Sequence, residues 1–276
     1  MRHDERMPVT RADVDATIRD LGLGGRAVCV HSSLRSFGTL EGGPDTLIDA
    51  FLDAGSTLLV PSHSWGFASN HRPGMRPERN GWDYSMNVAP PAFPGRFSVD
   101  SNAVDRNMGA IPRAVLARPE RRRGNHPLAS FTAIGPLAVD LVGKQCGDEV
   151  HAPLRALAEH DGAIVMIGVG LTRMTLLHYA EEVAGRAQFR RWALDGVDTV
   201  MVESGGCSEG FERLAPVLAP IETDRDVGPS RWRCFSAAEV VARAAAAIKA
   251  DPHATHCGLR TCSRCNDAEL GGPIVA

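Results

Sequence analysis

The chain has 276 residues, of which 43% are hydrophobic and 23% charged, as in a soluble globular protein with an ample core. Its net charge of −3 at pH 7 gives no polybasic signature, so we expect no nucleic-acid partner. No apolar stretch reaches the length of a membrane span, and residues 1–22 lack the apolar core of a signal peptide, so we expect a cytoplasmic protein with no membrane partner.

The hydrophobic pattern predicts strands and helices that alternate along the chain. Strands are predicted at 26–31, 57–61, 131–134, 163–167, 189–194, 197–202 and 231–235, and helices at 10–21, 42–52, 107–116, 153–160, 174–184 and 237–249. Two of the strands turn at Asp195-Gly196, a hairpin signal. No linker divides the chain, so the pattern indicates one α/β domain.

Two segments beside the early strands carry possible functional features. Ser32, Ser33 and Arg35 follow the first strand, where hydroxyls, a cation and free backbone amides can cradle a phosphate or pantetheine group. An ordinary strand-to-helix loop capped by serine is the alternative.

Residues 70–105 are rich in Pro, Gly, Asn and Arg, and an irregular segment of that length inside an enzyme predicts a flap over the site.

The segment 162–185 combines a buried strand, two glycines and a helix start. Ala163 to Ile167 form the strand, and His178 falls in the first turns of the helix. Helix starts at the carboxyl ends of strands are common ligand sites in α/β proteins. Glu181 and Glu182 follow three and four residues later, so one or both share the face of His178. The alternative is an ordinary surface or core histidine.

Seven cysteines give an odd count, and three of them cluster near the C-terminus. Cys257, Cys262 and Cys265, with one nearby histidine, could form a tetrahedral structural zinc site. The second Cys-x-x-Cys half of a zinc ribbon is missing, so zinc stays an open alternative and we predict no catalytic metal. Cys207 is interpreted as a small buried residue.

Several segments together resemble the aminoglycoside 3-N-acetyltransferase family, in that family's order. They are VHSSLRSFG at 30–38, EGGPDTLIDAF at 41–51, TLLVPSHSW at 57–65, MGAIPRAVL at 108–116, HPLASFTAIGPLA at 126–138, VMIGVGLTRMTLLHYAEE at 165–182 and CSEGFERL at 207–214. The resemblance implies an antibiotic N-acetyltransferase fold, an α/β fold with a central mixed sheet flanked by helices, unlike the common N-acetyltransferase superfamily. It implies a single acetyltransferase domain over about 1–250, followed by a Cys/His-containing tail at 251–276.

The resemblance also assigns roles to individual residues. It makes His178 the catalytic base and Glu212 its acidic partner, and it places Thr172 and Thr175 at the acetyl thioester. Coenzyme A is assigned to His31, Ser32, Ser33, Leu34, Arg35 and Met108. The substrate side is assigned to His126, and a polycationic amine needs acidic walls, for which Glu181, Glu182 and Asp83 are candidates.

The implied activity is transfer of acetyl from acetyl-CoA to the 3-amino group of an aminoglycoside antibiotic, a resistance reaction. A neutral imidazole can remove a proton from the substrate amine near neutral pH. We expect direct transfer in a ternary complex, by a monomer or a homodimer, with no acyl-enzyme on Cys207. Two alternatives stay open: acetylation of another small amine, such as an aminophosphonate or amino sugar, and a non-catalytic binding protein stabilised by zinc.

Overall fold

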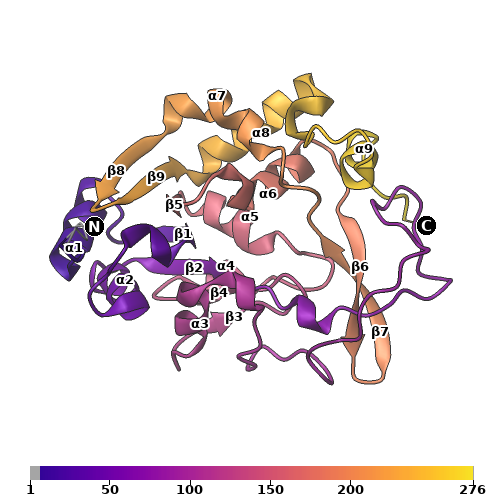
Figure 1. The fold of residues 1–276 in the computed structure, drawn as a ribbon, viewed down its shortest axis with the longest axis horizontal. Coiled ribbons are helices and arrows are strands. Elements are labelled where there is room, and N and C mark those ends of the chain that lie inside the picture. Colours follow the sequence, from indigo (N-terminus) through magenta and orange to yellow (C-terminus); the bar gives the residue numbers. More distant parts are fainter. Residues whose placement is uncertain (1–6, 276) are drawn as a thin grey trace, which may run out of the picture.

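A seven-stranded mixed sheet forms the centre of the protein in the computed structural model, which describes residues 7–275 (Figure 1). The strand order is β3-β4-β2-β1-β5-β9-β8. The strands are β1 (Ala27–Ser32), β2 (Thr57–Pro61), β3 (Arg122–Arg123), β4 (Phe131–Ile134), β5 (Ala163–Ile167), β8 (Thr223–Val227) and β9 (Ser230–Ser236). The three central strands, β2, β1 and β5, are parallel, whereas β4 and β9 run antiparallel to them. The predicted mixed sheet is therefore confirmed.

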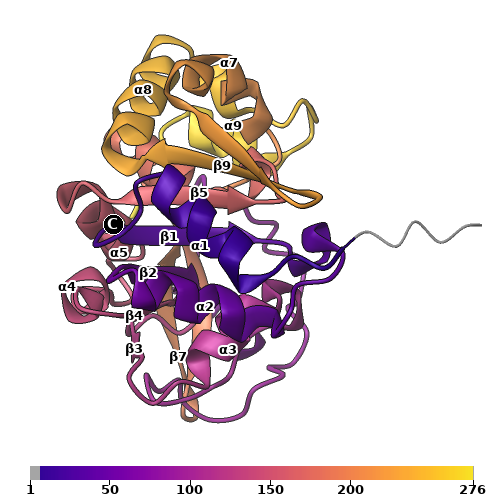
Figure 2. The same cartoon turned by 90° about the vertical axis from the view of Figure 1, so that its left-hand side faces the viewer.

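Helices cover both faces of this sheet. The helices of the described residues are α1 (Arg11–Asp20), α2 (Gly43–Asp53), α3 (Ala110–Leu116), α4 (Ala138–Val142), α5 (Ala152–Glu159), α6 (Leu176–Val183), α7 (Ala215–Leu218), α8 (Ala237–Ala250) and α9 (Ser263–Glu269), the last of which lies away from the sheet beside the hairpin (Figure 1). Helices α1, α2 and α3 share one apolar core with Val28 and Val30 of β1, and α4, α5, α6 and α8 share another with Cys29. Successive side chains of a strand point to opposite faces, so β1 alone contributes to both cores. In Figure 2, α4 and α2 lie on opposite sides of β2.

The strand predictions at 57–61, 131–134 and 163–167 match the structure to the residue, because these strands are continuous apolar runs buried on both faces. The helix predicted at 10–21 is α1, which starts with a capping box in which Thr10 and Asp13 bond each other's backbone. Strand β8 was not predicted. Its sequence, TDRDV, has four exposed residues out of five, so an edge strand of this kind shows no apolar pattern.

A separate hairpin extends beyond the sheet. Strands β6 (Phe189–Asp195) and β7 (Asp198–Ser204) pair antiparallel, with Gly196 in the left-handed region at φ +68° where the chain turns. The predicted hairpin is thus confirmed.

Much of the irregular segment 70–105 runs beside this hairpin (Figure 1). The side chain of Asn80 bonds both backbone groups of Arg190, and the rings of His71, Trp82 and Tyr84 surround Trp192. Most contacts of the predicted flap thus lie on the hairpin, and a role as a cover of a functional site stays a prediction. Its aromatic and Asn contacts make it a cover for β6 and β7.

Residues 251–275 fold back onto the domain and do not form a free tail. The N–H of Ile274 donates to the carbonyl of Glu78, and the N–H of Gly81 donates to the Asp267 carboxylate. The C-terminal segment and residues 70–105 therefore support each other beside the hairpin. Among residues 7–275, no helix combines the length and apolar character needed to cross a bilayer.

Candidate active site

One large cleft opens where the three parallel strands end. It has a volume of about 1060 Å³ and is lined by residues that follow β1, β2 and β5. The register aligns Ser32 at the end of β1 with Ile167 at the end of β5, so the loops after these strands start side by side. The carboxyl ends of adjacent parallel strands are a general location for ligand sites in α/β sheets.

Most residues assigned to coenzyme A and to catalysis line this cleft together. They are His31, Ser32, Ser33, Leu34, Arg35, Met108, Thr172, Thr175 and His178. They come from the end of β1 and the loop after it, from the segment before α3, and from the turn before α6 and the start of that helix. Segments more than a hundred residues apart thus form one surface because their strands are neighbours in the sheet.

His178 is held rigidly in the first turn of α6. Its Nδ1 lies 2.8 Å from Oε2 of Glu181, one helical turn later. The edge of Phe211 packs against the ring at 4.7 Å between centroids, and the His151 ring lies parallel to it at 6.3 Å. An ionised carboxylate can only accept, so Nδ1 carries a proton and Nε2 is the nitrogen left to act as a base.

Glu181 belongs to a fully bonded, buried network. Its Oε2 accepts from His178, and its Oε1 accepts from Arg186 Nη1 and from Thr255 Oγ1. Burial acts to raise the pKa of the Glu181 carboxyl, but the hydrogen bond from His178 and the charges of His178 and Arg186 outweigh it and lower the pKa overall. The carboxylate is therefore ionised at neutral pH and holds the imidazole in one orientation.

The predicted pairing of His178 with Glu212 is wrong. The Glu212 carboxylate accepts the backbone N–H of Leu171 at 2.5 Å and lies beside Gly170. It holds the loop between β5 and α6, and Glu181 takes the position beside the imidazole. The signal for Glu181 was present in the sequence, because residues three apart on a helix are neighbours.

The predicted substrate-binding residues do not line the cleft. Glu181 is buried in the network just described, and Glu182 accepts from His151 Nδ1 at 2.9 Å. Asp83 bonds Ser85 on the exposed surface of the 70–105 segment. His126 is fully buried, with Nε2 bonded to the Glu203 carbonyl and Nδ1 accepting two backbone N–H groups. Each of these four side chains is thus hydrogen-bonded to another group of the protein.

The cleft residues that could not be assigned from the sequence include three with titratable side chains: His63, Asp105 and His151. His63 follows β2, so the reasoning applied to the end of β1 would have found it. Asp105 accepts the backbone N–H groups of Trp65 and Gly66, which fixes its carboxylate at the rim. His151 precedes α5, and no spacing in the sequence connects it to His178.

Three buried imidazoles in the cleft, those of His31, His63 and His151, are neutral at pH 7. Burial lowers the pKa of His31 to about 3 and that of His63 to about 4, with smaller contributions from neighbouring charges. Burial also lowers the pKa of His151, against the opposing hydrogen bond to Glu182. These rings therefore add no positive charge that would repel a cationic substrate near His178.

Thr175 and His31 form a polar pair on the floor of the cleft. Thr175 Oγ1 lies 3.1 Å from His31 Nε2. If Nε2 carries the proton of the neutral His31 ring, it donates to the hydroxyl oxygen and leaves the Thr175 O–H free to donate into the cleft. A hydroxyl placed in this way can stabilise a developing oxyanion.

Gly205 leaves the room that the His178 ring occupies. A Cβ at position 205 would lie 2.8 Å from Cδ2 and 2.9 Å from Cγ of His178. We expect Gly205→Ala to displace the ring and lower kcat by roughly tenfold to a hundredfold, since misplacement by about 1 Å has effects of that size. Steady-state kinetics will check this against Gly74→Ala, whose added Cβ meets nothing within 4 Å. Equal kcat values for the two folded variants would refute the close packing of Gly205 on the ring.

Comparisons with known proteins agree on one family. A family model described as aminoglycoside 3-N-acetyltransferase matches residues 29–249. The chain is 35% identical over 184 residues to aminoglycoside N(3)-acetyltransferase IX of Micromonospora chalcea, which is 64% of this chain and 63% of that protein. It is 30% identical over 194 residues to aminoglycoside N(3)-acetyltransferase III of Serratia marcescens, with 66% and 67% covered. The match therefore spans somewhat less than two thirds of the Micromonospora protein.

Solved structures show the same fold. The apoenzyme of aminoglycoside acetyltransferase AAC(3)-IVa superposes with a TM-score of 0.76 at 24% identity, covering 98% of this chain and 100% of that one. Sisomicin-bound AAC-VIa superposes with a TM-score of 0.69 at 26% identity, covering 88% and 99%. The overall fold is thus shared over most of this chain.

Proposed function

Since this chain belongs to the aminoglycoside 3-N-acetyltransferase family, we propose that it transfers an acetyl group from acetyl-CoA to the 3-amino group of an aminoglycoside. The observation that carries the proposal is the His178–Glu181 pair, which opens on the same cleft as the segments assigned to coenzyme A. The names of the relatives and the sisomicin in the AAC-VIa structure support the choice of substrate.

His178 acts as the general base. A substrate ammonium loses a proton to Nε2, and the amine then attacks the thioester carbonyl. Glu181 stabilises the imidazolium that forms and keeps its ring in place. The C–N bond forms, the C–S bond breaks, and the departing sulfur takes up a proton, so the reaction releases an amide, the free thiol of coenzyme A and one proton overall.

Thr175 supports the carbonyl oxygen during this step. Its hydroxyl, oriented by His31 at 3.1 Å, donates to the oxyanion of the tetrahedral intermediate. Cys207 is absent from the residues that line the cleft, which supports direct transfer between the bound substrates over an acyl-enzyme on that thiol.

Four exposed arginines give the cleft a positive rim suited to the phosphates of coenzyme A: Arg35, Arg106, Arg113 and Arg173. Guanidinium groups bind phosphate oxygens through paired, charge-assisted hydrogen bonds. Only the first of the four was assigned from the sequence. The others come from the segment before α3, from α3 itself and from the turn before α6.

We expect Arg35→Ala and Arg173→Ala each to raise the KM for acetyl-CoA by roughly tenfold, equivalent to about 1.4 kcal/mol, with little change in kcat. The wild-type KM should also rise with ionic strength, because exposed charges are screened by salt. Initial rates at varied acetyl-CoA will measure both effects. Arg122→Ala is the control, since the exposed Arg122 side chain donates only to the carbonyl of Arg121. Unchanged KM values in both variants would exclude these arginines from coenzyme A binding.

A second candidate keeps the chemistry and changes the amine. Among the described residues that line the cleft, Asp105 is the one acidic side chain. Polycationic drugs are usually bound by several carboxylates, so a single acid favours a smaller amine, such as an amino sugar or an aminophosphonate.

A thiol-release assay with a panel of amines tests both candidates. Release with gentamicin-type or sisomicin-type amines, with the acetyl group located at the 3-amino position by NMR of the product, supports the proposed function. Release with small amines alone supports the second candidate. No release with any amine, from a folded protein that binds acetyl-CoA, would refute both.

A further inference from the structure

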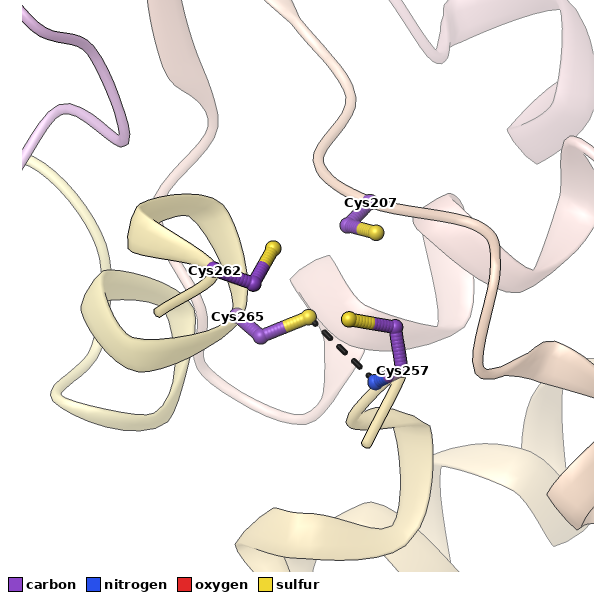
Figure 3. Close-up of side chains that lie close together, drawn as sticks. All are labelled: Cys207, Cys257, Cys262 and Cys265. Atoms are coloured by element: carbon purple, nitrogen blue, oxygen red, sulfur yellow. Dashed lines mark hydrogen bonds between the residues drawn. The ribbon is translucent and has the colours of Figure 1, made fainter. Parts of the chain in front are cut away.

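Four cysteines from three parts of the chain meet outside the cleft. Cys207 lies in the loop after β7, Cys257 follows the turn 252–255, and Cys262 and Cys265 lie at the start of α9 (Figure 3). Their Sγ atoms all lie within 4.8 Å of one another. We propose that these four thiolates bind one structural Zn²⁺ ion, which fastens the C-terminal segment to the loop beside His178.

The arrangement suits a tetrahedral tetrathiolate. A Zn–S distance of about 2.3 Å places the sulfurs of such a site about 3.8 Å apart, so the four side chains need only a small inward adjustment. All four thiols are free of disulfide bonds. The N–H of Cys257 donates to Sγ of Cys265 at 3.4 Å, the kind of backbone contact that stabilises a metal-bound thiolate (Figure 3).

The fourth ligand is Cys207 and not a histidine. His256 bonds Asn266 and the N–H of Gly258, and His253 pairs with Glu269. In the open alternative drawn from the sequence, one histidine joined the three C-terminal cysteines, and Cys207 was interpreted as a small buried residue. Fifty residues separate Cys207 from Cys257, so no local motif could have joined them.

Apolar burial by α9 contributes little to the stability of the C-terminal segment. Helix α9 spans seven residues, and its one buried side chain is Cys265. A segment this short buries too little apolar surface to fix its own position, and small segments of this kind are commonly fixed by a metal. Cys207 and Cys265 are buried and the other two thiols are half-buried, so the site is closed, as structural zinc sites are.

The zinc site adjoins the groups that orient the catalytic imidazole. Thr255 donates to Glu181 Oε1, and Arg186 Nη2 donates to the carbonyl of Pro252. On the other side, Gly205 packs on the His178 ring and is separated from Cys207 by one residue. The four thiols thus fix both the loop and the segment that hold the His178–Glu181 pair. The effect on catalysis rests on the proposed function, whereas the metal site does not.

Metal analysis of the purified full chain tests the site directly. We expect inductively coupled plasma mass spectrometry to find one zinc ion per chain. After substitution of the zinc by cobalt, the absorption spectrum of the protein should show the intense visible bands of a tetrahedral tetrathiolate site. Cys207→Ser and Cys262→Ser should lose the zinc and this spectrum and should melt at lower temperature. Cys146→Ser, which changes an exposed thiol outside the cluster, should keep both.

Several outcomes would overturn the proposal. One is wild-type protein that holds no stoichiometric metal and whose four thiols all react with a thiol reagent. Others are disulfide bonds among the four cysteines, or iron bound in place of zinc. An unchanged cobalt spectrum in Cys207→Ser would also overturn it. These readouts need no turnover. His178→Ala should therefore keep its zinc even if it is inactive, which separates a failure of the zinc proposal from a failure of the proposed function.

Discussion

His178→Ala is expected to lose roughly 10²–10⁴-fold in kcat, the range attributed to a positioned general base. Among the described residues that line the cleft, His178 is the one histidine with a buried carboxylate on Nδ1, and it lies at the start of α6. The KM for acetyl-CoA should change little, because the arginines and the loop after β1 remain in place. Steady-state kinetics at saturating amine will measure the loss.

Two controls keep this result interpretable. His160→Ala removes an exposed histidine at the end of α5 and should leave kcat unchanged. Thermal melting of His178→Ala will show whether the fold survives the loss of a buried ring. A folded His178→Ala protein with wild-type kcat would exclude His178 as the base.

Glu181→Gln is expected to lower kcat roughly a hundredfold or more, because the amide neither holds the imidazole tautomer nor stabilises the imidazolium. It should also lower the free energy of unfolding by about 3–5 kcal/mol, since Arg186 is left with an uncompensated buried charge. Both KM values should change much less than kcat, as expected of a positioning residue. Kinetics and denaturant unfolding on the same preparation will separate the two effects.

Glu212→Gln is the matched comparison. Its side chain can still accept the Leu171 N–H, so we expect a loss in kcat of less than roughly tenfold. A larger kcat loss in Glu212→Gln than in Glu181→Gln would restore the pairing inferred from the sequence and contradict the one in the structure.

The parts of the fold that the sequence predicted are those governed by local patterns. Buried strands such as 163–167 are continuous apolar runs, and the first helix carries its own capping box. Strand β8 and helix α9 depend on neighbours instead, since the first is an exposed edge and the second has a single buried side chain. Such elements leave no apolar period in the sequence.

The residues of the candidate site also fall into two groups, those that local sequence patterns predict and those that depend on tertiary contacts. Residues at the end of a parallel strand or in the segment that follows it, such as Ser32, Arg35 and His178, could be predicted because adjacent parallel strands end at one edge of the sheet. The acidic partner was misassigned because the resemblance was preferred over the helical spacing that already placed Glu181 beside His178. The substrate-binding carboxylates could not be predicted for a different reason. Whether a carboxylate faces the cleft or is buried in a hydrogen bond depends on tertiary contacts, which the sequence pattern does not show.

Chemical rescue tests the central claim most directly. His178→Gly leaves space for an added base, so thiol release by this variant should rise with imidazole concentration and then saturate. Glu181→Gln, which keeps its own ring, should show no such rise. A His178→Gly protein that turns over at the wild-type rate without imidazole, or that fails to respond to it at any concentration, would contradict proton removal by His178.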